Sequence, residues 1–410
     1  MGEGAFDVAA FARAFDHHSR DFTDHLNQIF AHMREECPIA WTPAYGGFWV
    51  LTRYEDVRQV VLDDANWSKL PGMSIPSNRE AHDPPTFLPG DLDPPEHDVY
   101  RQLLDPLLSP AALVRLGPFI RQTVRELIDG FIEKGEADLV VDLAAPLTAI
   151  VTLKFAGLPL EDWPNYVAER REANAAPLPA EEEIRIVMER FEWTRQAFLK
   201  AYDEQQGNPV PGGMIERIFN ARIDGRELTR DEYLAIMLNV VIGGLETTQA
   251  LLGSAWLHLA HHPEDREDLR ANLDLMPAAV EEMLRCFSPQ PGLARTALAD
   301  VELGGQLIRK GEKVFMCWAS ANYDAAKFDE PERFDIRRKP NRHLTFGAGV
   351  HQCYGRNLTR LEAQICMAEV LTRLPDYRVI DERVEHIPDS STVYGYLSLP
   401  VTFTPGERLA

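Results

Sequence analysis

One apolar stretch, residues 229–263, is long enough to run from one side of a domain to the other. It begins with Thr229 and Glu232, which have the spacing of a helix capping box, and it ends at Pro263. About 33 residues of helix would extend roughly 50 Å at 1.5 Å per residue. The rest of the chain must therefore pack around this helix. Two adjacent glycines in its middle should weaken or distort it.

The pattern outside this helix predicts a mainly α protein with small β-sheets. Helical periodicity dominates from about residue 100 to residue 287. Glycine pairs at 46–47 and 304–305 lie between apolar arms and predict two β-hairpins, and the C-terminal STVYGYLSLPVTF also has β character. Residues 66–96 are rich in Pro, Gly and polar residues, which is typical of an active-site loop or lid. We find no convincing linker and expect a single domain, 1–410.

Composition limits the possible partners and the cellular compartment. The chain has 410 residues, 45% of them hydrophobic, and a net charge of −22, which argues against nucleic acid as a partner. Five cysteines without a CxxC pair indicate a reducing compartment. The N-terminus does not resemble a signal peptide. The chain contains no uninterrupted run of about 18 apolar residues that would predict a membrane anchor. We expect a cytoplasmic protein without a flavin or dinucleotide site of its own.

The most informative short motif is FGAGVHQCYG, residues 346–355. Its glycines allow the backbone to approach a flat ligand closely. Cys353 lies just before a stretch with helical periodicity, where the helix N-terminus favours the thiolate. A thiolate held in this way is a suitable axial ligand for haem iron. We interpret the other cysteines, namely Cys37, Cys286, Cys317 and Cys366, as core or surface thiols.

This motif resembles the cysteine-ligand loop of the cytochrome P-450 superfamily. Phe346, Gly349, Cys353 and Gly355 match every required position of the family pattern. The resemblance implies the cytochrome P-450 fold, a long central helix over the haem, and haem b (iron protoporphyrin IX) with a Cys thiolate as axial ligand. It also implies a monooxygenase that inserts one oxygen atom from O2 into a small hydrophobic substrate, by hydroxylation or O-dealkylation. A peroxide-driven peroxygenase and a non-catalytic haem sensor or ligand carrier are the alternatives.

The same resemblance assigns roles to further residues. The residues expected to bind the haem, together with Cys353 as the metal ligand, are His97, Arg101, Arg295, His351, Phe346, Gly347, Gly349 and Gly244. The first four would bind the propionates, since buried carboxylates need cationic partners. Glu246 and Thr247 in the long helix match the family's acid–alcohol pair and would deliver protons to bound oxygen.

A Glu-x-x-Arg motif, Glu282 and Arg285, places an acid and a base on one helix face. The resemblance implies that this pair is buried and supports the haem pocket together with a second arginine. Arg338 and Arg342 are both candidates for that arginine.

The substrate pocket is expected to include Phe87, Asn239, Ile242, Leu293 and Val393, with Tyr394 as a further possibility. Asn239 could hydrogen-bond a carbonyl or ether oxygen of the substrate, or it could cap local backbone. The run from GGLETT to VLTRLPDY is similar to that of the camphor-hydroxylase branch, which implies a terpenoid or compact aromatic substrate.

Electrons are expected from a separate ferredoxin or flavodoxin with its reductase. The segment RFDIRRKPNR, residues 333–342, carries five basic residues against one acid in this acidic chain. It could dock an acidic partner or simply be a solvated loop. Two departures from the family pattern, Tyr354 and Thr359, could alter packing around the thiolate.

Overall fold

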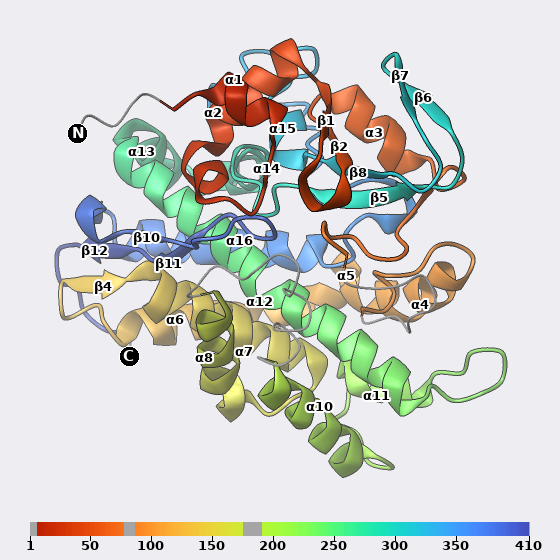
Figure 1. Ribbon diagram of the computed structural model, residues 1–410. Coiled ribbons are helices and arrows are strands. Elements are labelled where there is room, and N and C mark those ends of the chain that lie inside the picture. The colour runs from red at the N-terminus through yellow and green to blue at the C-terminus, as the bar shows by residue number, and fades with distance from the viewer. Residues whose placement is uncertain (1–5, 78–86, 175–190, 410) are drawn as a thin grey trace.

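A computed structural model describes residues 6–77, 87–174 and 191–409, and its centre is the long helix α12 (Arg230–His261). Figure 1 shows α12 running diagonally across the molecule, with the N-terminal helices and the larger sheet on one side and α6, α7, α8 and α10 on the other. The capping box is present: Glu232 N donates to Thr229 Oγ1 over 3.1 Å and Thr229 N donates to Glu232 Oε2 over 2.7 Å. The helix is unbroken, so its glycine pair does not interrupt it.

The described helices besides α12 are α1 (Val8–Arg13), α2 (Arg20–Glu36), α3 (Tyr54–Leu62), α4 (Glu96–Leu104), α5 (Pro110–Leu113), α6 (Gly117–Asp129), α7 (Ala145–Ala156), α8 (Trp163–Asn174), α10 (Glu192–Gln205), α11 (Met214–Asn220), α13 (Pro263–Ala271), α14 (Met276–Cys286), α15 (Trp318–Ala321) and α16 (Arg356–Arg373). A π-helical segment, Leu139–Ala144, leads directly into α7.

The strands form four small sheets. Their bounds are β1 (Ile39–Thr42), β2 (Phe48–Leu51), β3 (Trp67–Ser68), β4 (Glu136–Asp138), β5 (Leu293–Ala297), β6 (Val301–Leu303), β7 (Gln306–Ile308), β8 (Lys313–Met316), β9 (Arg378–Val379), β10 (Glu385–His386), β11 (Tyr396–Ser398) and β12 (Pro400–Thr402). The largest sheet has the order β1-β2-β8-β5-β3, in which only the β2–β8 pair is parallel.

The fold class and both hairpins are confirmed, with one difference. β1 pairs with β2 and β6 pairs with β7, as the two glycine pairs predicted. The second arm of the later hairpin is short, however, and the chain continues into a third strand, β8, which crosses into the large sheet. Residues 78–86 of the expected lid lie outside the described residues.

Close packing between α12 and α7 explains one of the two central glycines. A Cβ added to Gly244 would lie 2.6 Å from Thr152 Oγ1 of α7, so any larger residue would push the helices apart. A Cβ added to Gly243 would meet nothing within 4 Å. Gly244 therefore serves helix packing, whereas Gly243 borders open space.

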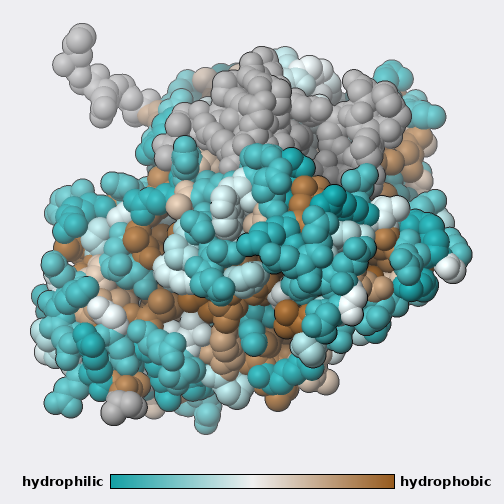
Figure 2. Space-filling model, turned by 90° about the horizontal axis from the view of Figure 1, so that it is seen from below, coloured by the Kyte–Doolittle hydropathy of each residue, from teal (hydrophilic) through white to brown (hydrophobic). Residues whose placement is uncertain are grey.

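Two helical stretches, Leu139–Ala156 and Arg230–His261, are long and apolar enough to cross a membrane by length and composition. Neither stretch was predicted from the sequence, because polar and charged residues interrupt both apolar runs. In the fold most of each stretch is buried against the rest of the protein. The face shown in Figure 2 carries separate hydrophobic patches among mainly hydrophilic residues.

Candidate active site

The loop before α16 presents Cys353 to a cavity. Cys353 N donates to Phe346 O over 2.9 Å, which closes the loop on itself. Gly347 and Gly349 have φ values of 65° and 68°, a backbone conformation that glycine adopts without strain. The Cys353 side chain is exposed, and it lines the cavity between this loop and α12.

The cavity has a volume of about 290 Å³ and is bounded by α12 on one side and the cysteine loop on the other. From α12 it is lined by Asn239, Val240, Gly243, Gly244, Thr247 and Thr248, and from the loop and α16 by Phe346, Gly347, His351, Cys353, Tyr354, Gly355, Leu358, Thr359 and Glu362. Because Cys353 and Thr247 line the same cavity, a ligand bound to the sulfur would have the alcohol within the same enclosed space.

Although the Cys353 side chain is open to the cavity, the protein around the thiol desolvates it and raises its pKa, while the Gly355 backbone N–H and the charges of Arg101 and Arg356 act in the opposite direction. The backbone N–H groups at the start of α16 and the two arginines thus favour the thiolate, and desolvation opposes them. A metal cation bound to the sulfur would supply the missing stabilisation, since a coordinating thiol is deprotonated by its metal.

Four cationic or imidazole side chains meet at one end of this cavity: His97, Arg101, Arg295 and His351 all line it. The His97 and His351 rings are 4.3 Å apart in an edge-to-face arrangement. Arg295 is 3% exposed, and among the described residues its side chain has one hydrogen-bond partner, the neighbouring Ala294 O at 3.2 Å. Burial lowers the pKa of Arg295 to about 10.

These groups fit a ligand with buried carboxylates. His351 Nδ1 is buried without a hydrogen-bond partner, and a nearly unpaired buried guanidinium is unfavourable unless an anion joins it. Arg101 has a double role, because it also donates to Gln352 O over 2.8 Å and pairs with Asp105 at 2.8 Å. The residues present therefore fit a haem, whose iron would meet Cys353 and whose propionates would meet these cations.

The acid and the alcohol of α12 face different surroundings. Thr247 Oγ1 donates to Gly243 O over 2.8 Å and the residue lines the cavity. Glu246 is buried outside it, where its carboxylate pairs with Arg170 and accepts a hydrogen bond from Asn174. All three border a separate cavity of about 40 Å³. The two neighbours in sequence thus lie on different sides of the helix.

Two groups on α16 lie beside the cavity, and the sequence singled out only the first of them, Thr359, as a departure from the family pattern. Thr359 Oγ1 lies 3.2 Å from Thr248 Oγ1, which links α16 to α12 beside the cavity. Glu362 is buried, its Oε2 lacks a hydrogen-bond partner, and burial raises its pKa well above the ordinary value. A carboxylate three residues after Thr359 could have been noticed from helical spacing, but its burial could not. Lys69, a buried residue that also lines the cavity, was missed entirely.

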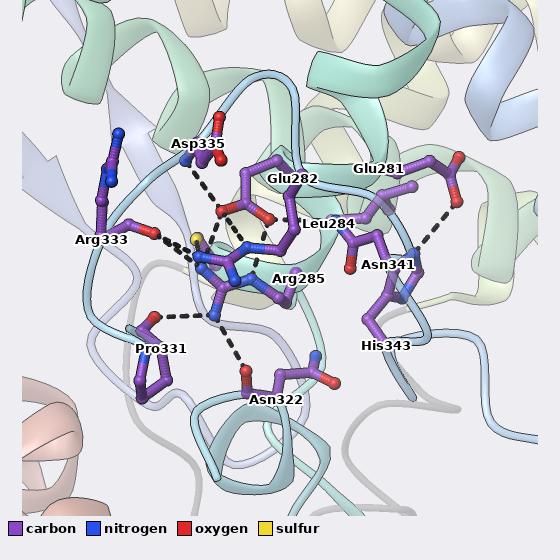
Figure 3. A network of polar contacts seen from close by, with 12 residues as sticks. Glu281, Glu282, Leu284, Arg285, Asn322, Pro331, Arg333, Asp335, Asn341 and His343 are labelled. Atoms are coloured by element: carbon purple, nitrogen blue, oxygen red, sulfur yellow. Dashed lines mark hydrogen bonds and ion pairs between the residues drawn. The ribbon is translucent and has the colours of Figure 1, made fainter. Parts of the chain in front are cut away.

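Figure 3 shows the Glu-x-x-Arg pair as the centre of a buried polar network. Arg285 donates to both carboxylate oxygens of Glu282 at 2.8 Å. Arg338 Nε and Asn341 Nδ2 each donate to Glu282 over 3.0 Å. The second arginine of the network is therefore Arg338, whereas the exposed Arg342 does not contact Glu282.

Only part of the expected substrate pocket lines the cavity. Asn239 and Leu293 do, while Phe87, Ile242 and Val393 pack in hydrophobic clusters and Tyr394 packs against the N-terminal helices. The described wall also includes residues that were not anticipated: Met73, Pro89, Gly90, Phe155, Val240, Pro289 and Gln290. Most of these come from loops, whose path cannot be read from sequence periodicity.

The remaining cysteines behave as thiols of the fold. Cys317 and Cys366 are buried, Cys37 and Cys286 are partly buried, and all are free. Across the three described ranges no group of three or more His, Cys, Asp or Glu side chains could hold a metal ion.

The fold and the site together define a haem-thiolate protein, with a long helix on one side of the cofactor cavity and a glycine-rich cysteine loop on the other. Comparison with known proteins agrees. A model of the family "Cytochrome P450" matches residues 177–390. The chain belongs to the cytochrome P450 family.

Its relatives include named monooxygenases. The chain is 34% identical to the 20-oxo-5-O-mycaminosyltylactone 23-monooxygenase of Streptomyces fradiae over 91% of this chain and 89% of that protein. It is 34% identical to a steroid C26-monooxygenase of Mycolicibacterium smegmatis over 77% of this chain and 79% of that protein. The crystal structure of CYP109E1 from Bacillus megaterium with testosterone has a TM-score of 0.85 at 27% identity, covering 94% of this chain and 100% of that chain. The protein is accordingly a cytochrome P450 monooxygenase that uses haem.

Proposed function

We propose that Cys353 holds the haem iron and that the cavity beside Thr247 receives an apolar substrate, which is oxygenated there. Haem, when bound, supplies oxygen activation and transfer of one oxygen atom to the substrate. The observation that supports this most is that the cysteine and the alcohol line one cavity, which the buried and nearly unpaired Arg295 also lines. The loop glycines let the backbone pass close to the cofactor, and His97, Arg101, Arg295 and His351 bind its propionates.

Replacing Cys353 with His tests the ligand assignment. The reduced, carbon monoxide-treated variant should lose the absorption band that marks a thiolate-ligated haem, since imidazole does not donate charge as a thiolate does. Cys37→Ser is the matched control, because Cys37 is a partly buried thiol outside the cavity lining, and this variant should keep the band. A band that survives in Cys353→His would show that another residue is the ligand.

Thr247 and Glu246 are proposed to act in proton delivery, at different distances from the reaction. Thr247 borders the cavity, so its hydroxyl can hold a proton or a water molecule next to the place where the substrate is oxygenated. Glu246, on the other side of α12 and paired with Arg170, would act as the outer reservoir. Replacing Thr247 with Val should lower product formed per O2 consumed and raise released peroxide, while Gln at position 246 should slow turnover with less change in that ratio.

The substrate is proposed to be an apolar molecule that carries a hydrogen-bond donor such as a hydroxyl. Asn239 Nδ2 donates to Leu88 O over 2.9 Å, and since a carbonyl only accepts, this contact determines which end of the amide faces Leu88. Asn239 Oδ1 accepts no hydrogen bond from the described residues. The capping alternative thus accounts for one N–H of the amide, and the oxygen would accept a hydrogen bond from a ligand hydroxyl, which a ligand carbonyl cannot donate.

Testosterone and androstenedione form a suitable pair of probes, because they differ only in a hydroxyl that is a ketone in the second. A steroid C26-monooxygenase is among the relatives. Spectral titration should give tighter binding of testosterone by about 2- to 10-fold, the worth of one neutral hydrogen bond. In Asn239→Leu the ratio of the two dissociation constants should approach one. Any loosening of the Leu88 loop affects both steroids alike and cancels in this ratio. An unchanged ratio, or no spectral change with either steroid, would contradict the proposal.

A separate ferredoxin or flavodoxin is proposed as the electron donor, docking near residues 333–342. Three of the basic side chains there have acidic partners within the chain: Arg333 with Glu330, Arg337 with Asp268, and Arg338 with Glu282. Lys339 and Arg342 are exposed and are the better candidates for docking. Reversing both to Glu should slow reduction by an acidic donor at low salt. An unchanged rate would favour the solvated-loop alternative. We also propose a cytoplasmic location, in keeping with the bacterial relatives.

A further inference from the structure

Lys69 is a buried lysine at the propionate end of the cavity. It follows β3, is 6% exposed, and lines the cavity together with Arg295 and His351. Its ammonium group makes no hydrogen bond or ion pair with the described residues. Burial lowers the pKa of Lys69 well below its ordinary value. A buried ammonium without a partner is unfavourable, so its presence calls for an anion.

The acids around Lys69 are already engaged by other groups. Asp93 accepts hydrogen bonds from Ser68 Oγ and from Lys69 N, the latter over 2.9 Å. Asp91 accepts from Phe87 N over 2.9 Å. The charges that act on Lys69 besides these acids are those of Arg295 and Arg101, which repel it. The local balance is therefore an excess of positive charge that faces the cavity.

A partly buried lysine, Lys313, shows how this chain satisfies such a group when no ligand is involved. Lys313 of β8 donates its Nζ to Gly72 O over 3.1 Å, and it is not among the residues that line the cavity. Lys69 differs in both respects. Lys69 is therefore placed for a bound molecule and not for the stability of the loop.

We propose that Lys69 binds a haem propionate directly, as a fifth cationic group beside His97, Arg101, Arg295 and His351. This inference rests on the proposed haem site. The backbone supports it: Asp93 holds Lys69 N through its side chain and His97 N, 3.0 Å away, through its carbonyl. Asp93 thus positions both Lys69 and the first turn of α4. Binding of the carboxylate also anchors the start of the loop that supplies Met73 to the cavity wall.

The test compares the variants Lys69→Met, Lys69→Arg and Lys313→Met, each purified as holoenzyme. The readout is the rate at which haem transfers to excess apomyoglobin. Lys69→Met should lose haem about tenfold faster, because a charge-assisted hydrogen bond to the propionate is gone. Lys69→Arg should stay within about threefold of the wild type, since it keeps the cation. Lys313→Met should transfer haem at the wild-type rate.

The reduction potential gives an independent readout. Loss of a cation beside the cofactor favours the more positive, oxidised iron, so Lys69→Met should have a more negative potential than the wild type. Lys69→Gln serves for the same comparison if the Met variant does not fold. Equal transfer rates for Lys69→Met and wild type would overturn the proposal, as would equal acceleration in Lys313→Met. A wild type without the thiolate band would instead refute the haem site itself.

Discussion

Two clusters of buried charge in this protein differ in how completely their members are paired. In the first, Glu282 accepts from Arg285, Arg338 and Asn341 and from Asp335 N, and Arg285 also donates to the carbonyl oxygens of Asn322, Pro331 and Arg333. In the second, Lys69, Arg295 and His351 have few partners among the described residues: Arg295 donates to Ala294 O, and His351 Nε2 lies 3.7 Å from Asp64 Oδ1 while its Nδ1 has none. Both clusters are buried, so burial alone does not distinguish them.

This difference in pairing indicates a different role for each cluster. A buried charge whose hydrogen bonds are all satisfied within the chain holds segments of the fold together, here α14 and the loop that precedes the cysteine loop. A buried charge without partners is unfavourable until a ligand completes it. Removing a member should therefore cost stability in the first cluster and cofactor affinity in the second.

The largest expected effect is on the first cluster. Glu282→Gln leaves Arg285 and Arg338 buried without a counter-charge, and should lower the free energy of unfolding by about 3–5 kcal/mol. Urea unfolding of the apoprotein measures this. The control is Glu330→Gln, which removes an exposed pair with Arg333 at the same i, i+3 spacing and should cost under about 1 kcal/mol. A similar loss of unfolding free energy in both variants would mean that burial does not determine how much an ion pair stabilises the fold.

The second effect separates affinity from stability. Arg295→Met removes a buried cation with one hydrogen bond, so the apoprotein should keep its free energy of unfolding to within about 1 kcal/mol. Haem affinity should fall by about 10- to 100-fold, since the propionate loses a charged partner. Haem titration of the apoprotein measures the affinity, and the exposed Arg309→Met is the control. A large loss of apoprotein stability would mean that Arg295 stabilises the fold, as the members of the first cluster do.

The smallest effect concerns Glu281, a partly exposed neighbour of the first cluster. Burial raises its pKa, but hydrogen bonds from Arg360 and His343 outweigh this and lower the pKa to about 2. The folded state thus binds fewer protons than the unfolded state, so this stabilisation is present above pH 4.5 and is lost as the pH falls toward 2. Glu281→Gln should cost about 1 kcal/mol at pH 7. The difference from wild type should shrink below pH 4.5, and a constant difference would contradict the assignment.

Local patterns predicted a large part of the fold. The capping box and Pro263 predicted α12 to within a residue or two at each end, because helix termini depend on short-range hydrogen bonds. The glycine pairs predicted two hairpins for the same reason. The parallel pairing of β2 with β8 was not predictable, since it joins segments more than 250 residues apart and leaves no local trace.

The site was predictable where a motif specifies it. The cysteine loop and the four propionate candidates were all singled out, and the structure brings them to one cavity. Glu246 was grouped with Thr247 because they are adjacent, yet adjacent helical residues point about 100° apart, and only packing against α8 shows which side each one faces. Lys69 carries no motif, and nothing in SKLPG distinguishes it from a surface lysine.

The sequence alone determined the chemistry: a thiol in a glycine-rich turn before a helix, and the long helix that carries an acid and an alcohol. These follow from residue types at short spacings, which govern local backbone and reactivity. Tertiary structure decided which charges are paired and which face the cavity, and so separated Arg285 from Arg295 and Lys313 from Lys69. Pairing depends on contacts between distant segments, and the free energy of a buried charge is set by the neighbours that those contacts provide.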